Sequence, residues 1–352
     1  MSEPLVTIGI PAFQKERHLR ATLDAALAQT HRHLEVLVAD NASTDATRAI
    51  AADYAARDAR VRIVHHRRNL GSRRNFNVVF ELAQGDFFVW GRGHDVWHPD
   101  FVAAAVELLA RDPRLVLVHS ACREIDGDDR DLGPVVEDLD TRGLALPQRL
   151  RACWLSLLGP ATLGVIRRTA MDRTNLYQDL AGCDLVFLLE LAREGTFAFV
   201  DRPLLKLRRV RSEGSEAESV QRTWRQMNPH RDRRESPDLH VLEYLQANAR
   251  VVRDLDVAPA VRDQLLGELV QCFASRFEGS FTRAFDHLAD RVEAAAADPA
   301  GTSERLDAVR ALHWLDQLHL GLLCQPNHER ALTARNTLLH LALDLLPASV
   351  TP

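Results

Sequence analysis

Short apolar runs alternate with amphipathic stretches along the first 120 positions of the chain. Runs of four to six apolar, mostly β-branched or aromatic residues predict buried strands at Leu5–Ile10, Leu34–Ala39, Val61–His65 and Phe87–Trp90. Between them, apolar positions at helical spacing predict helices over 18–30, over 46–58 and through Val78–Ala83. Strands and helices that alternate in this way favour an α/β fold with a mainly parallel sheet and flanking helices.

The alternation continues beyond the fourth strand. It predicts helices over 101–111, 149–158, 167–176 and Leu185–Ala192, and strands at Leu115–Ser120, Gly164–Arg167 and Thr196–Val200. The acidic, glycine-containing stretch 122–148 is typical of a surface excursion. Pro11 is expected to end the first strand, because proline cannot donate to a strand ladder.

The character of the sequence changes near Glu213. Residues 213–238 are polar and highly charged, which predicts a linker. From 239 onward the helical period returns in at least three segments, without a catalytic pattern. We therefore expect a domain at 1–212, a polar linker at 213–238 and an all-helical C-terminal region at 239–352.

At 352 residues, with 46% hydrophobic and 26% charged residues, the chain has the composition of a soluble globular protein. Its net charge of −5 lacks the basic bias of nucleic-acid binders, so no nucleic-acid partner is expected. The five cysteines form no CxxC pair, which predicts reduced thiols in a cytoplasmic protein. No signal-peptide pattern opens the chain and no apolar run reaches 18 residues, so peripheral contact is the one membrane association left open.

The stretch Phe87–Phe101 carries the densest candidate chemistry. Its strand runs into a loop with two glycines that bears Arg92, His94 and Asp95, and a helix follows. Open α/β sheets bind ligands at such strand ends. From spacing alone, an ordinary connection between a strand and a helix fits equally well.

Further polar side chains stand at other strand and helix ends. Asp40 directly follows the second strand, where short polar side chains suit a ligand-binding loop. Arg73 and Arg74 begin a helix whose free N–H groups favour anions, so either a phosphate or a solvated basic turn explains them. Asp184 precedes the apolar helix Leu185–Ala192, a position that most often holds a helix cap.

Four segments in a fixed order carry a family resemblance. They are VTIGIPAFQKERHLRATLDAALAQT, LEVLVADNASTDATRAIA, RNLGSRRNFNVVFELAQGDFFVWGRGHDVWHPDFV and GCDLVFLLELAREGTFAFVDRPLLKLRRVRS. Over about residues 4–212, the chain resembles the inverting family 2 glycosyltransferases of the GT-A fold. The resemblance implies a Rossmann-like sheet that binds a nucleotide-sugar, and it does not extend to the helical C-terminal region.

The resemblance implies a role for each candidate side chain. Asp184 matches the general base that takes a proton from the acceptor. His94 and Asp95 match the family's DxD region, which holds a divalent cation, Mn²⁺ or Mg²⁺. Contacts to the donor nucleotide are implied for Pro11, Phe13, Asp40, Asn69, Gly71, Arg73, Arg74, Arg92 and Arg211.

The DxD region departs from the family pattern. Arg92 stands at the first acidic position and His94 at a metal-ligand position, and Arg211 replaces a frequent histidine. Inversion at an anomeric carbon still needs a base and a counter-charge for the departing nucleoside diphosphate. His94 and Asp95 can hold Mn²⁺, because that ion tolerates imidazole. Alternatively, Arg92 and Arg211 supply positive charge directly, without a metal.

The expected function is transfer of a sugar, with inversion, from a UDP-, dTDP- or GDP-sugar to a sugar, lipid-linked or small-molecule acceptor. The altered DxD region supports an alternative, a catalytically silent nucleotide-sugar-binding or assembly protein. The C-terminal helices pack on the catalytic domain, form a homodimer or shape the acceptor site, and the sequence does not choose between these roles.

Overall fold

The computed structural model describes residues 3–155, 159–180, 182–209 and 240–277. The chain divides into two compact units, Met1–Arg231 and Asp232–Pro352. The linker expected at 213–238 and most of the expected helical region lie outside the described residues. The sheet belongs to the first unit.

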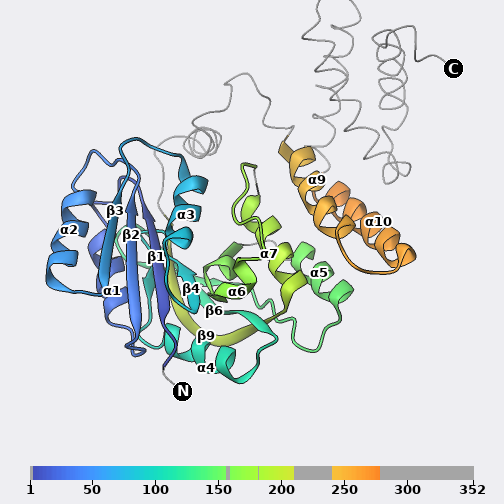
Figure 1. Cartoon of the computed structure of the whole chain (residues 1–352), viewed down its shortest axis with the longest axis horizontal. Helices are drawn as coiled ribbons and strands as arrows, with labels where there is room; N and C mark the ends of the chain where they lie inside the picture. The colour runs from blue at the N-terminus through green and yellow to red at the C-terminus, as the bar shows by residue number, and fades with distance from the viewer. Residues whose placement is uncertain (1–2, 156–158, 181, 210–239, 278–352) are drawn as a thin grey trace, which may run out of the picture. The chain divides into compact units, whose positions relative to one another are not determined.

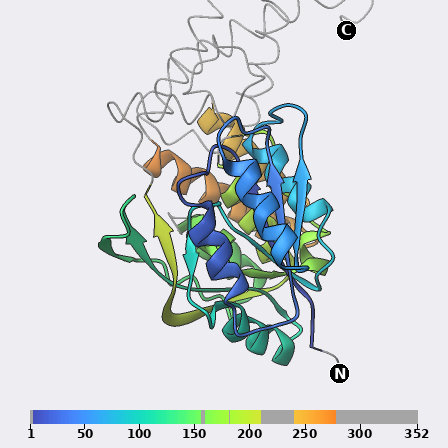
Figure 2. The ribbon, with the colours of Figure 1, turned by 90° about the vertical axis from the view of Figure 1, so that its left-hand side faces the viewer.

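A nine-stranded sheet has the order β3-β2-β1-β4-β8-β6-β9-β5, with β7 paired to β6. Its N-terminal half is parallel and consists of β1 (Val6–Ala12), β2 (Leu34–Asp40), β3 (Val61–His65) and β4 (Phe87–Trp90). On one face lie α1 (Leu19–Leu27) and α2 (Thr47–Arg57), and on the other lies α3 (Ser72–Glu81) (Figure 1, Figure 2). The predicted α/β class is confirmed.

Pro11 does not end β1, contrary to the expectation from the sequence. In the parallel register, the carbonyl of Ala12 accepts from the N–H of Asn41 beyond β2, so the neighbouring Pro11 nitrogen faces the β4 side. β4 pairs with β1 only as far as Gly9 and Trp90. The missing N–H of Pro11 therefore removes no ladder hydrogen bond.

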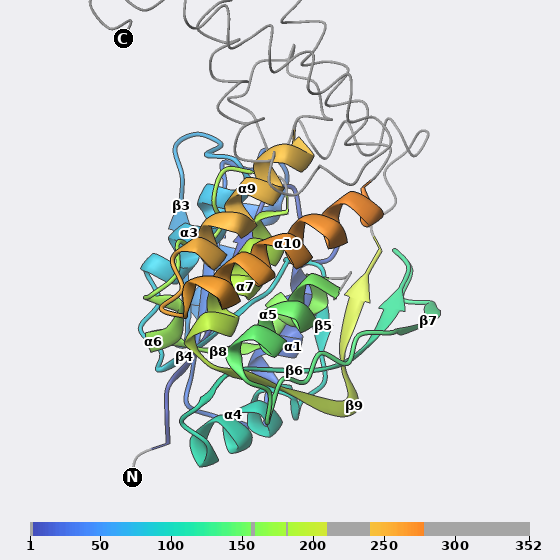
Figure 3. The ribbon, with the colours of Figure 1, turned by 90° about the vertical axis from the view of Figure 1, so that its right-hand side faces the viewer.

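The C-terminal half of the sheet is mixed. β8 (Val165–Arg167) lies antiparallel between β4 and β6 (Leu115–Ile125), and β6 runs parallel to β9 (Thr196–Arg208). β5 (Val96–Trp97) and β7 (Asp131–Val135) add antiparallel partners to β9 and β6 (Figure 3). The sheet therefore reaches well beyond its parallel N-terminal half.

Two predictions for this half are wrong in their extent. The strands expected to end at Ser120 and Val200 continue to Ile125 and Arg208. The stretch expected as a surface excursion accordingly contains the end of β6 and all of β7. These strand ends carry several charged residues, so their sequence lacks the apolar run that marks a buried strand.

The further helical segments of the first unit are α4 (Phe101–Arg111), α5 (Leu146–Leu155), the 3₁₀ turn η1 (Gly159–Leu163), α6 (Arg168–Met171) and α7 (Cys183–Glu194). α6 is shorter than the helix predicted over 167–176. In the second unit, α9 (His240–Arg253) and α10 (Pro259–Arg276) pack together, with the ring centroids of Tyr244 and Phe273 4.8 Å apart. None of the helices in the described ranges has the length and apolarity to cross a membrane.

Strand β4 supplies large aromatic side chains to the core. Phe88 and Trp90 are fully buried and meet edge to face, with ring centroids 5.3 Å apart. A Cβ on Gly9 of the neighbouring strand would lie 2.6 Å from the Phe88 ring, so only glycine allows this close packing. Trp90 also stacks on Tyr177 with centroids 4.6 Å apart, which joins the core to the loop before α7.

We expect Phe88→Ala to lower the free energy of unfolding by about 3–5 kcal/mol, because it removes a fully buried ring and leaves a cavity. Leu132→Ala on β7 is the matched control, since that side chain is 49% exposed and should change stability by less than about 0.5 kcal/mol. Urea unfolding followed by circular dichroism measures both. Equal effects of the two substitutions would contradict the placement of Phe88 in the core.

Candidate active site

The parallel strands β1, β2 and β4 end at one edge of the sheet, and most candidate side chains lie in the loops that follow. Polar contacts lock two of these loops together. The Gln14 Oε1 accepts from the N–H groups of Thr44 and Asp45 at 3.1 and 3.2 Å. The N–H of Lys15 donates to Thr47 Oγ1 at 2.7 Å. The loop after β1 is thereby held against the start of α2.

Three residues expected at the donor nucleotide lie around this pair of loops. Pro11 is buried in β1, and Phe13 is half-buried just after it. Asp40 is buried at the end of β2, where its Oδ1 accepts from the Ser43 N–H at 3.1 Å and its Oδ2 lies 3.5 Å from His65 Nδ1. These contacts orient the Asp40 carboxylate.

Asn69 and Gly71 form a turn that Asn41 holds in place. Asn41 Nδ2 donates to Asn69 Oδ1 at 2.8 Å, and Asn41 Oδ1 accepts from the Leu70 N–H at 2.8 Å. Gly71 has a φ of 84°, a conformation that favours glycine, and it directly precedes α3. No sequence signal singles out Asn41, because asparagine is common in polar loops.

The two arginines at the start of α3 point in different directions. Arg73 is 7% exposed, and its Nη1 donates to Asp179 Oδ1 at 2.7 Å. Arg74 is exposed and pairs with Glu81 on the same helix. Arg73 lines a pocket beside α7, and Arg74 does not.

The loop after β4 is organised by an ion pair between Arg92 and Asp95. Arg92 Nε and Nη2 donate to the two carboxylate oxygens at 2.6 and 2.9 Å, and the N–H of Arg208 donates to Asp95 Oδ1 at 3.0 Å. Asp95 is 1% exposed. Burial alone would raise the pKa of its carboxyl, but the charge and hydrogen bonds of Arg92 hold that pKa below its ordinary value.

His94 contacts Lys15 more closely than it contacts Asp95. Its Nδ1 lies 2.8 Å from Lys15 Nζ, whereas its Nε2 lies 3.9 Å from Asp95 Oδ1. Burial lowers the pKa of His94 to about 3 and the pKa of Lys15 to about 8. At neutral pH the imidazole is therefore neutral and the lysine is mostly charged. Lys15 is one of only two lysines in the chain, which is the signal that could have drawn attention to it.

His94 and Asp95 do not fit the expected divalent-cation site in this arrangement. Both Asp95 oxygens already accept from Arg92, and the Lys15 ammonium, which can only donate, engages His94 Nδ1. Within the described part of the chain, no group of three or more His, Cys, Asp or Glu side chains could hold a metal ion. Mg²⁺ and Mn²⁺ prefer several oxygen ligands, so the loop presents cations where such ligands were expected.

Arg208 anchors the same loop from β9. Its buried guanidinium donates from Nε to the His94 carbonyl at 2.9 Å and pairs through Nη2 with Asp129 at 2.6 Å. Its Nη1 also donates to the Asp126 carbonyl at 2.9 Å, so the Arg208 guanidinium is engaged within the protein. Arg211, which was expected to contact the donor nucleotide, lies outside the described residues.

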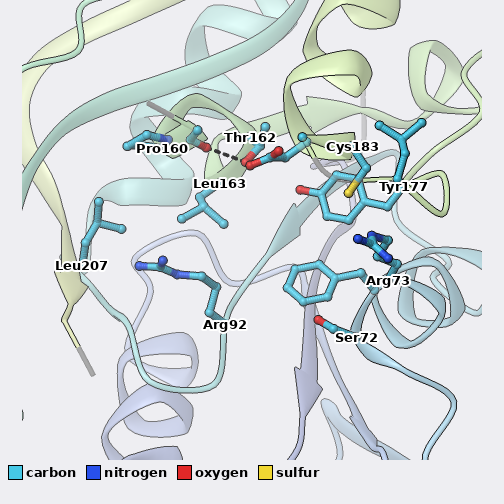
Figure 4. Close-up of a pocket in the computed structure, with 14 residues that line it drawn as sticks. Ser72, Arg73, Arg92, Pro160, Thr162, Leu163, Tyr177, Cys183 and Leu207 are labelled. Carbon is cyan, nitrogen blue, oxygen red and sulfur yellow. Dashed lines mark hydrogen bonds between the residues drawn. The ribbon is translucent and has the colours of Figure 1, made fainter. Parts of the chain in front are cut away.

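A pocket of about 390 Å³ is bordered by α3, the loop after β4 and the start of α7 (Figure 4). Arg73, Arg92 and Asp184 line it from these three elements. Asp184 lies in the first turn of α7, where its Oδ1 accepts from the Leu185 N–H at 3.1 Å. Burial raises the pKa of the Asp184 carboxyl, although the helix N–H groups and Arg73 oppose the rise. A carboxylate with a raised pKa in a pocket is a candidate for proton transfer.

The Asp184 carboxylate has room because residue 159 lacks a side chain. A Cβ on Gly159 would lie 2.8 Å from Asp184 Oδ2. Thr162 Oγ1 donates to the Gly159 carbonyl at 2.5 Å, which fixes this 3₁₀ turn (Figure 4). From the sequence, Gly159 is recognisable only as a helix breaker.

The loop before α7 is tied to that helix by Glu190. Glu190 is 2% exposed and accepts from the N–H and Nδ2 of Asn175, both at 2.7 Å, and from Gln178 Nε2 at 3.1 Å. This loop carries Tyr177, whose ring lines the pocket. Glu190 is the single acidic residue in the apolar run Leu185–Ala192, which is the signal that marks it.

We expect Glu190→Ala to lower the free energy of unfolding by about 1–3 kcal/mol, because the Asn175 donors lose their acceptor. Near-UV circular dichroism should also show weaker packing of Tyr177 on Trp90. Glu107→Ala on α4 is the matched control, because this exposed carboxylate pairs with Arg111 and should cost less than about 1 kcal/mol. Equal loss of the near-UV signal in both variants would contradict the anchoring role of Glu190.

The central α/β sheet with its flanking helices has the GT-A glycosyltransferase fold. The structure of S. aureus TarS residues 1–349 in complex with UDP-GlcNAc gives a TM-score of 0.64 at 16% identity, covering 96% of this chain and 88% of that chain. Mannosyltransferase PcManGT from Pyrobaculum calidifontis, solved with GDP-Man and Mn²⁺, gives a TM-score of 0.51 at 22% identity, over 98% of this chain and 87% of that chain. At these identities, the likeness shows the fold.

Residues 7–169 match the family model described as Glycosyl transferase family 2. The putative teichuronic acid biosynthesis glycosyltransferase TuaG of Bacillus subtilis is 30% identical over 107 residues, which are 30% of this chain and 42% of that protein. Chondroitin synthase of Escherichia coli is 32% identical over 123 residues, 35% of this chain and 18% of that protein. The chain thus spans less than half the length of these relatives. Residues 7–169 therefore belong to glycosyl transferase family 2.

Proposed function

We propose that the chain transfers a sugar from a nucleotide-diphosphate sugar to an acceptor, with inversion at the anomeric carbon. The observation that carries the proposal is that Asp184, Arg73 and Arg92 line one pocket of a family 2 domain. The displacement needs a base for the acceptor hydroxyl and positive charge near the leaving group. One carboxylate and two guanidinium groups meet both needs.

Asp184 takes the proton from the acceptor hydroxyl as that oxygen bonds to the anomeric carbon. The bond from this carbon to the nucleoside diphosphate breaks on the opposite face, and its electron pair stays on the phosphate oxygen. Asp184 Oδ1 is held by the Leu185 N–H, so Oδ2, beside Gly159, is the oxygen that receives the proton. Arg92 and Arg73, which reach the pocket from different sides, offset the charge that develops on the diphosphate (Figure 4).

The nucleotide is proposed to lie over the ends of β1 and β2. Asp40 accepts a hydrogen bond from the base, Pro11 and Phe13 lie beside it, and the turn at Asn69–Gly71 approaches it. TarS in complex with UDP-GlcNAc and PcManGT in complex with GDP-Man support a nucleotide-sugar donor. Because those two nucleotides differ in their base, UDP-, dTDP- and GDP-sugars are all candidates, and the acceptor is a sugar, a lipid-linked sugar or a small molecule.

Asp184→Asn should lower kcat by about 10²–10⁴-fold with little change in donor binding, because a carboxamide cannot take the proton. Mass-spectrometric screening of UDP-, dTDP- and GDP-sugars against candidate acceptors identifies the reaction, and product formation then measures kcat. Asp172→Asn is the control, since this half-exposed carboxylate pairs with Arg168, does not line the pocket and should leave kcat unchanged. Near-normal turnover in Asp184→Asn would refute the base, and nucleotide binding without any turnover in the wild-type chain would favour the catalytically silent binder.

As the pH is lowered, the rate of sugar transfer should begin to fall at a higher pH than it would with an aspartate of ordinary pKa. The reaction requires the Asp184 carboxylate, and burial raises the pKa of that carboxyl above its ordinary value of 3.8. Protonation therefore begins at a higher pH and removes the base as the pH falls. The pH profile of kcat/KM measures this limb, and a profile that stays flat down to about pH 4 would contradict the assignment.

A further inference from the structure

The loop after β4 places cations, not metal ligands, beside the pocket. Building on the proposed function, we propose that Arg92, supported by Lys15, binds the diphosphate of the donor directly and that nucleotide binding needs no divalent cation. Three features carry this inference: the engagement of Asp95, the direction of the hydrogen bond at His94, and the free edge of Arg92.

The Asp95 carboxylate is engaged by three donors. Arg92 Nε and Nη2 take one oxygen each, and the Arg208 N–H takes a further position on Oδ1. At 1% exposure, the carboxylate is also shielded from solvent. A cation bound at the lone pair left on Oδ2 would lie next to the positive charge of the Arg92 guanidinium. Coulomb repulsion at such short range opposes cation binding there.

His94 offers no ligand nitrogen in this arrangement. An ammonium carries hydrogens and no lone pair, so Lys15 Nζ at 2.8 Å donates to His94 Nδ1. A neutral imidazole with Nδ1 as acceptor carries its proton on Nε2, and that nitrogen then has no lone pair for a metal. Metal binding at Nδ1 would need the departure of Lys15, and binding at Nε2 would also need a change of tautomer.

Arg92 is placed to receive an anion. Because Nε and Nη2 are directed at Asp95, the Nη1 edge of the planar guanidinium is left for another partner. The side chain is 36% exposed and lines the pocket (Figure 4). Guanidinium edges match phosphate oxygens in geometry, and the Asp95 contacts fix the orientation of this one before a ligand arrives.

Lys15 adds a positive charge that forms no ion pair within the described residues, although the charge of Asp95 acts on it. The charge of Arg92 is matched by Asp95 and that of Arg208 by Asp129. Within the described residues, Lys15 contacts the neutral ring of His94 and forms no ion pair. Lys15, from the loop after β1, therefore adds an unmatched positive charge next to the loop after β4, which an anionic diphosphate would offset.

Isothermal titration of the full chain with UDP, dTDP and GDP, each in EDTA and in Mn²⁺, tests the proposal. We expect the nucleotide that binds to show the same Kd within about twofold under both conditions, because the charge comes from side chains. The double variant Arg92→Gln with Asp95→Asn removes the Arg92 guanidinium without leaving the buried carboxylate of residue 95 unpaired. This variant should weaken binding of the nucleoside diphosphate at least about tenfold, while binding of the matching nucleoside stays unchanged.

Two single variants sharpen this experiment. Lys15→Met should weaken diphosphate binding and spare the nucleoside, whereas Arg111→Gln, an exposed residue of α4 paired with Glu107, should change neither. Binding at least about tenfold weaker in EDTA, or one Mn²⁺ bound per chain by electron paramagnetic resonance, would overturn the inference and leave the proposed function standing. If none of the three nucleotides binds under either condition, the proposed function fails and the inference fails with it.

Discussion

The ion pair between Arg92 and Asp95 is the interaction on which the rest of the site depends. A carboxylate with almost no solvent contact persists as an anion only if charge and hydrogen bonds surround it, and Arg92 with the Arg208 N–H supplies both. The pair decides which atoms of the loop after β4 face the pocket. In a loop that resembles a metal-binding motif in sequence, the pair occupies the Asp95 carboxylate and presents Arg92 to the pocket. The pair contributes more to the orientation of the Arg92 side chain than to the net stability of the fold, because desolvation offsets much of the attraction in a buried pair.

Two halves of the site are made rigid by different means. On the nucleotide side, the amide groups of Gln14 and Asn41 cross-link loops that would otherwise be independent. On the side of the proposed base, the buried carboxylate of Glu190 ties the Tyr177 loop to α7, and the missing side chain of Gly159 makes room for Asp184. The apolar core lies beneath, and short polar contacts set the positions of the side chains above it.

Apolar periodicity was enough to predict the α/β class and nearly all elements as far as α4, because β1, β2 and β4 are buried and mostly apolar along their whole length. It failed at the charged ends of β6 and β9, where the neighbouring strands, not the local composition, define the structure. The loop after β4 shows the same limit at the site. His94 meets Lys15 across 79 residues, and Asp95 meets the Arg208 N–H across 113. No local pattern encodes such contacts, so the motif could be located from sequence but the partners of its side chains could not.

The pairing of β5 with β9 also bears on how the protein is made. A chain emerging from the ribosome can form β1 to β4 and their helices early, since each parallel strand follows its neighbour closely in the sequence. Val96 and Trp97 meet Lys206 and Leu205 only after more than a hundred further residues have been synthesised. Contacts of this separation form late and slowly. The contacts that join the end of the loop after β4 to β9 are therefore expected to form after those of the parallel half of the sheet.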